Sequence, residues 1–108
     1  MPEPDDSPGD VFAALADPTR RQLLDRLSAD GPMSATALAR EYPVSRQAVV
    51  KHLNTLAGAG LLHPERHGRE VLYGVDPSRL GEATGWLKQV GDRWDRRLDA
   101  LKAQLRTD

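Results

Sequence analysis

The side chains with the clearest chemical potential lie in one stretch, "VSRQAVVKHLNTLAGAGLL", residues 44–62. There the polar side chains of Arg46, Gln47, Lys51 and Asn54 are interleaved with aliphatic residues. An arginine can donate two hydrogen bonds to a guanine edge, and a glutamine or asparagine amide can bind an adenine edge. The same residue types are common on solvated helix faces. The composition of the stretch therefore leaves two interpretations open, a nucleic-acid-reading surface and an ordinary exposed helix.

The spacing of the aliphatic residues predicts a helix over about residues 45–57. Val49, Leu53 and Leu56 recur at i, i+4 and i+7, which places them on one buried face. Ser45 is a suitable N-cap at a helix terminus that could meet a phosphate, while Gly58 and Gly60 end the pattern. The remaining face offers the candidate DNA-binding residues Ser45, Arg46, Gln47, Val50, Lys51 and Asn54, with His52 beside them as a candidate phosphate contact.

Other chemistry finds little support in the sequence. The chain has no cysteine, which excludes disulfides and thiolate metal sites. Its three histidines are scattered, and Ser45 and His52 would be about 10 Å apart along a helix, too far for a nucleophile and its base. There is also no glycine-rich phosphate loop. We therefore expect neither an enzyme nor a protein with a metal or cofactor.

The preceding segment predicts two helices that would support this face. Asp17 and Pro18 form a helix start signal, and Leu23, Leu24 and Leu27 mark a buried face up to the sequence "SADGP". Ser34 can cap a second, short helix, "ATALAREY", which Pro43 stops.

The following segment predicts a β-hairpin over about residues 62–75, with a turn at His67-Gly68, and then a long helix over about residues 78–106. An apolar stripe runs along that helix from Leu80 to Leu105 with an average spacing of about 3.6 residues. Gly81 and Gly85 lie inside it and predict a bend or a late start.

Length and charge indicate one small domain. The 108 residues divide into an acidic tail, predicted to be flexible, at residues 1–9 and a folded domain at residues 10–108. The net charge is −1, but residues 1–17 hold five acidic and no basic residues, so residues 18–108 carry +4. No signal peptide is evident, and the longest apolar run, "VFAALA", is far shorter than the roughly 18 residues of a membrane span. We expect a cytoplasmic protein without a membrane partner.

The predicted order of helix, short helix, turn, helix and basic hairpin is that of a winged helix-turn-helix, mainly α with a small hairpin. From Val11 onward the chain resembles the ArsR/SmtB winged-helix repressors, above all in "DPTRRQLL" and in the residues from Ser45 to Leu62. The resemblance implies a homodimer that binds operator DNA and blocks transcription. It places the recognition helix at Ser45 and the tip of the wing at Arg66, His67, Gly68 and Arg69.

Within that family, the chain resembles the metal-independent branch. The cysteines of one metal-sensing site correspond to Ser34 and Thr36 here, and hydroxyls bind soft metals poorly. A second family site needs a histidine on the last helix, which has none. The acidic cluster there is interspersed with basic residues and is expected to form solvated ion pairs. The small-molecule effector, if any, is unknown.

The apolar stripe spans about 37 Å, more than one small domain can cover, and this predicts a dimer. The predicted interface residues are Phe12, Leu15, Leu87, Val90, Trp94, Leu98 and Leu101. Two recognition helices about 34 Å apart would read a palindromic operator. Two alternatives remain open: the stripe folds back into a monomeric core, or the chain is a winged-helix protein-protein interaction module without DNA binding.

Overall fold

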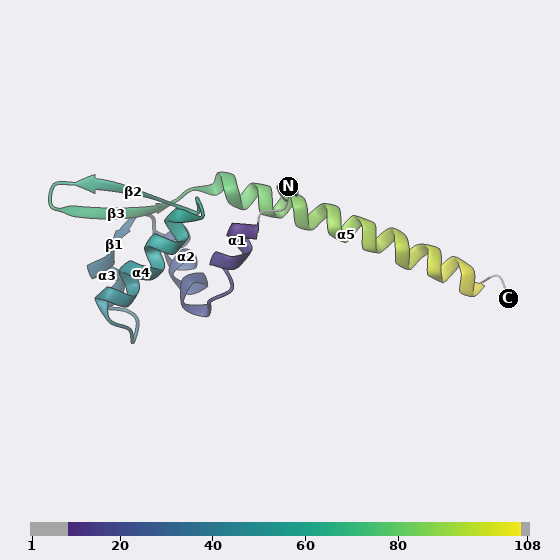
Figure 1. Ribbon diagram of the computed structural model, residues 1–108, viewed down its shortest axis with the longest axis horizontal. Helices are drawn as coiled ribbons and strands as arrows, with labels where there is room; N and C mark the ends of the chain where they lie inside the picture. Colours follow the sequence, from purple (N-terminus) through teal and green to yellow (C-terminus); the bar gives the residue numbers. More distant parts are fainter. Residues whose placement is uncertain (1–8, 107–108) are drawn as a thin grey trace, which may run out of the picture.

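The computed structural model describes residues 9–106, which form a mainly helical domain with a small antiparallel sheet (Figure 1). The helices are α1 (Gly9–Ala14), α2 (Pro18–Asp30), α3 (Ala35–Ala39), α4 (Arg46–Gly58) and α5 (Pro77–Arg106). The strands are β1 (Met33–Ser34), β2 (Leu62–His67) and β3 (Glu70–Val75). The predicted winged helix-turn-helix fold is thus confirmed. Apart from Gly9, which begins α1, the predicted acidic tail lies outside the described residues.

Three side-chain caps start the helices where the sequence predicted them. Asp17 accepts hydrogen bonds from the backbone N–H groups of Thr19 and Arg20, and this lowers the pKa of Asp17. Ser34 caps α3 and Ser45 caps α4 in the same way, each at 3.1 Å. Each cap satisfies backbone donors that have no partner within the helix.

Helix α3 is shorter than predicted, because it ends at Ala39 rather than at Tyr42. Tyr42 precedes Pro43, and the proline ring disfavours helical backbone at the residue before it. The side chain of Glu41 turns toward α2 instead, where Arg26 donates to both of its carboxylate oxygens at 2.7 and 2.8 Å. This ion pair lowers the pKa of Glu41 and ties the turn between α3 and α4 to α2.

The predicted hairpin is confirmed, but it belongs to a sheet with the strand order β1-β3-β2. The two-residue strand β1 pairs with β3, so β2 forms an edge of the sheet. The predicted turn position was wrong by one residue, because His67 pairs with Glu70 and the turn is Gly68-Arg69. Gly68 has φ +62°, as the first turn residue of a type II′ hairpin requires.

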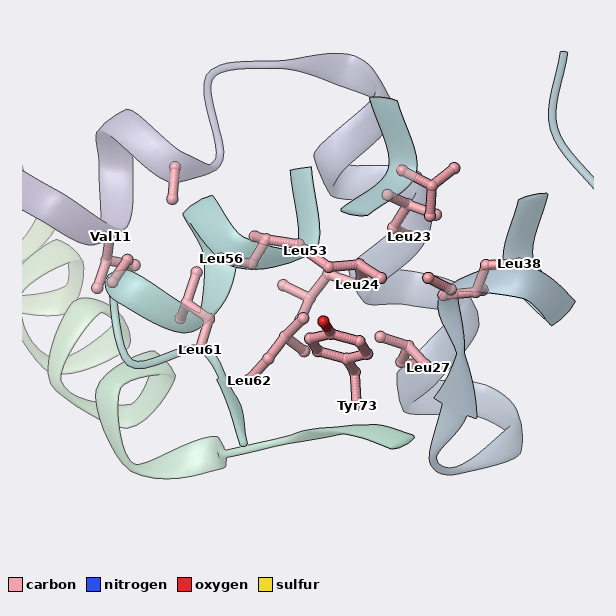
Figure 2. Packing of buried hydrophobic residues seen from close by; sticks show 14 of the residues in the cluster. Val11, Leu23, Leu24, Leu27, Leu38, Leu53, Leu56, Leu61, Leu62 and Tyr73 are labelled. Atoms are coloured by element: carbon pink, nitrogen blue, oxygen red, sulfur yellow. The ribbon is translucent and has the colours of Figure 1, made fainter. Parts of the chain in front are cut away.

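The core lies between α2, α3, α4 and the sheet (Figure 2). Its largest fully buried side chains are Val11, Leu23, Leu27, Leu38, Val49, Leu53, Leu56 and Leu61. Tyr73 of β3 closes the core from the side of the sheet. The three residues predicted to form the buried face of α4 are all among these, so that prediction is confirmed.

Helix α5 runs without interruption for 30 residues from Pro77, so the predicted late start beyond Gly81 and Gly85 was wrong. Its first turns pass α1, and the rest projects beyond the domain (Figure 1). The radius of gyration is consequently 18.9 Å, against about 13 Å for a compact chain of this length. Within residues 9–106, no helix has both the length and the apolar character needed to cross a membrane.

Candidate nucleic-acid interface

Helix α4 presents a polar face to solvent opposite the core. At about 100° per residue, Gln47, Lys51 and Asn54 lie roughly opposite Val49 on the helix. All three side chains are exposed, whereas Val49 is fully buried. Ser45 is also exposed, and its hydroxyl accepts the Ala48 N–H at 3.1 Å. The structure thus brings two amides and an ammonium group together on one accessible face.

One flank of α4 faces α3 and the wing, the hairpin formed by β2 and β3. Arg46 Nε donates to Thr36 Oγ1 of α3 at 3.0 Å, so the exposed guanidinium is oriented by a neighbouring helix. Val50, which was predicted to be exposed, is half-buried and packs against the core. Both residues line a recess of about 250 Å³ that Arg69 and Tyr73 close on the side of the wing.

The opposite flank of α4 carries His52, which is half-buried. Its Nδ1 lies 3.4 Å from Nη1 of Arg20 in α2. A guanidinium can only donate, so His52 accepts through an unprotonated Nδ1. The histidine therefore faces the α1–α2 corner rather than the exposed centre of the polar face.

The tip of the wing is accessible and carries two arginines, with Glu65 and Glu70 on either side of them. Arg66, His67 and Arg69 are all exposed, and Arg66 Nε donates to the Gly68 carbonyl at 3.2 Å. Glu65 lies beside His67, with 3.7 Å between the carboxylate and Nε2. The two-residue turn places both arginines at the end of a projecting hairpin, where they are free to meet an anionic surface.

The hydroxyls of Ser34 and Thr36 already have hydrogen-bond partners. Ser34 accepts from the Ala37 N–H, and Thr36 accepts from Arg46. In residues 9–106, no three His, Cys, Asp or Glu side chains lie together as potential metal ligands. Metal independence stays a prediction, for which these contacts supply a structural reason.

The stripe on α5 is largely uncovered in the single chain. Leu87, Trp94, Leu98, Leu101 and Leu105 are each 49–70% exposed, while Val90 is half-buried. Phe12 and Leu15 of the α1 segment are half-buried against the core. Phe12 also packs on Trp86 of α5, with ring centroids 5.3 Å apart and a 57° angle between the planes. Helix α1 is thereby attached to α5 beside the exposed stripe.

A short helix, a turn and a second helix with an exposed polar face, followed by a hairpin with two arginines at its tip, define a winged helix-turn-helix domain. Residues 15–65 match a helix-turn-helix domain family. The chain is 45% identical to the HTH-type transcriptional regulator Rv2034 of Mycobacterium tuberculosis over 68% of each chain. It is 32% identical to the transcriptional repressor SdpR of Bacillus subtilis over 79% of this chain and 93% of that protein.

A solved structure, an ArsR-like transcriptional regulator from Rhodococcus sp. RHA1, is similar over 89% of this chain and 90% of its own. The TM-score is 0.78 and the sequence identity 43%. The chain belongs to the ArsR family of helix-turn-helix transcriptional regulators.

Sequence reasoning missed two residues of this region. Arg20 contacts α4, but nothing in the spacing of "DPTRRQLL" distinguishes it from its neighbour Arg21. Trp86 holds α1 in place, although it stands one position outside the regular apolar stripe. Its size and its place directly before Leu87 were the available signal.

Proposed function

We propose that this protein is a homodimeric transcriptional repressor that binds a palindromic operator with α4 and the wing. The observation that carries the proposal is the exposed face of Gln47, Lys51 and Asn54 together with the exposed arginines of the wing tip. Amides read adenine edges in the major groove, and a lysine can bind guanine or phosphate. Arg46 would reach the same groove from the edge of the face, and Ser45 would meet a phosphate at the helix N-terminus.

The wing supplies the second part of the proposed contact. Arg66 and Arg69, with His67 and the narrow Gly68 turn, would follow the sugar-phosphate backbone next to the groove that α4 occupies. Such contacts add affinity for any sequence, whereas the α4 face chooses among sequences. This division assigns nonspecific affinity to the two exposed arginines of the wing and sequence choice to the amides of α4.

The dimer would form through the exposed stripe of α5. The interface would comprise Phe12, Leu15, Leu87, Val90, Trp94, Leu98 and Leu101. Burying the stripe against a second copy removes several large apolar side chains from water without uncovering any part of the core. A two-fold axis across α5 presents one α4 per subunit, so the two half-sites would be centred about 34 Å apart.

Footprinting on the promoter region upstream of the protein's own gene tests the proposal. We expect protection of an imperfect palindrome, with an affinity that falls steeply as salt rises. A matched duplex with scrambled half-sites controls for nonspecific binding. Equal affinity for the two duplexes at every salt concentration would contradict sequence-specific repression.

A further inference from the structure

Helix α4 is held on both flanks by side-chain hydrogen bonds in addition to its buried face. Apolar packing of Val49, Leu53 and Leu56 fixes the distance of the helix from the core, but such contacts are not directional. His52 and Arg46 lie about 60° to either side of Val49 on the helix. Their contacts, with Arg20 on one flank and Thr36 on the other, therefore control rotation of the helix about its axis.

Arg20 connects three helices through one guanidinium group. Arg20 lies in the first turn of α2, where its backbone N–H donates to the Asp17 carboxylate at 3.1 Å. Its Nε donates to the Ala14 carbonyl at 2.6 Å and its Nη2 to the Ala13 carbonyl at 3.2 Å, both at the end of α1. Its remaining nitrogen, Nη1, reaches His52. All side-chain nitrogens of Arg20 therefore face protein groups.

We propose that Arg20 is a positioning residue for DNA reading. It sets the rotation of α4 through His52 and links that rotation to α1. Since Phe12 attaches α1 to Trp86, the link continues to α5, the helix that carries the proposed dimer surface. The proposal rests on the proposed function, and it assigns His52 to the support of α4 rather than to a phosphate.

The neighbouring Arg21 provides a matched control. Its Nη1 donates to the Leu15 carbonyl at 2.7 Å, so it also fastens the end of the α1 segment to α2. It carries the same charge and is exposed, and within residues 9–106 its side chain makes a hydrogen bond only to the α1 segment. Arg20→Gln and Arg21→Gln thus remove equal charge from the same corner, but only the first releases α4.

The test measures binding of the full-length variants to the footprinted duplex and to a scrambled duplex over a range of salt. For Arg20→Gln we expect the Kd of the operator duplex to rise about tenfold, roughly the value of one charge-assisted hydrogen bond. The Kd of the scrambled duplex and the salt slope should stay unchanged, because Arg20 does not touch phosphate. Arg21→Gln should match the wild type on both duplexes.

Variants of His52 test the same contact from the other side. His52→Leu removes the acceptor and should weaken operator binding as Arg20→Gln does, whereas His52→Gln retains an acceptor and should bind nearly as the wild type. The double variant Arg20→Gln/His52→Leu should bind the operator no more weakly than Arg20→Gln alone, because both substitutions remove the same contact between Arg20 and His52. If Arg20→Gln fails to fold or dimerise, His52→Leu still tests the contact, because it leaves the hydrogen bonds of Arg20 to the Ala13 and Ala14 carbonyls of α1 in place.

Several results would overturn the assignment. A flatter salt slope and an equal loss on both duplexes for Arg20→Gln or His52→Leu would identify a phosphate contact instead. Wild-type operator affinity in His52→Leu, or equal operator affinities of Arg20→Gln and Arg21→Gln, would show that the contact does not position α4. In each case the wild type still selects the operator, whereas failure of the proposed function would appear as a wild-type protein that does not.

Discussion

Replacing Trp94 with glutamate should split the proposed dimer. Trp94 is 56% exposed in the single chain, which for a side chain of roughly 250 Å² leaves about 140 Å² in contact with water. At about 25 cal/mol per Å², covering this area in each of two subunits is worth up to about 7 kcal/mol. If the partner covers half of this exposed area, the Trp94→Glu substitution loses about 3.5 kcal/mol of dimerisation free energy. That weakens the dimer by more than about 100-fold, before the cost of burying a carboxylate is added.

Sedimentation equilibrium over a concentration series measures this change directly. The control is Ala103→Glu, which adds the same charge on the opposite side of α5, nine residues and about 180° from Trp94. We expect the control to remain dimeric and the Trp94 variant to be monomeric, with unchanged helix content and without tight operator binding. A wild-type monomer at tens of micromolar, or equal dimer affinities for the two variants, would refute the reasoning.

Three further predictions concern reading, metals and acid. Gln47→Ala or Asn54→Ala should weaken operator binding by about 1–3 kcal/mol and relax the sequence preference at one base pair. Arg69→Ala should instead weaken binding to all duplexes alike and flatten the salt slope by about one unit. Unchanged binding in all three variants would show that the DNA-binding surface has been assigned wrongly. Micromolar zinc, cadmium or arsenite should leave operator binding unaltered, and a stoichiometric metal by calorimetry that releases DNA would overturn this. The backbone N–H of Arg20 lowers the pKa of Asp17 below its ordinary value of 3.8 in the folded protein. The Asp17 cap therefore stabilises the fold above that pH, and this stabilisation is lost as the pH falls through the lowered pKa of the folded state. Urea unfolding of Asp17→Asn should therefore show a shallower loss of stability in acid than the wild type, and parallel curves would contradict the role of the cap.

Features that depend on neighbours in sequence could be predicted. The three caps join a side chain to backbone groups two or three residues ahead, so residue type alone indicates them. The buried face of α4 follows from a regular spacing. The exposed faces of α4 and α5 could be predicted as well, because they consist of the residues that are left once the core residues have been assigned.

Contacts between distant segments could not be predicted. Arg20 and His52 are 32 residues apart, and their meeting depends on how α2 packs against α4. Val50 was expected on the exposed face, but it is half-buried against the core, because that flank of α4 faces α3 and the sheet in the folded domain. Strand β1 has two residues, too few to show an alternating pattern. The hairpin turn depended on whether the glycine takes its first or second position, which the strand register decides.

The position of β2 at the edge of the sheet bears on whether copies of the protein can pair with one another through their backbones. An edge strand exposes unpaired backbone groups and can pair with the edge of another molecule, the first step of many aggregation reactions. Pro64 in this strand has no N–H to donate, and the charged or polar side chains of Glu65, Arg66 and His67 follow it along the strand. The strand can therefore project into solvent without pairing with the sheet of another molecule. The same residues leave the wing free to contact a partner.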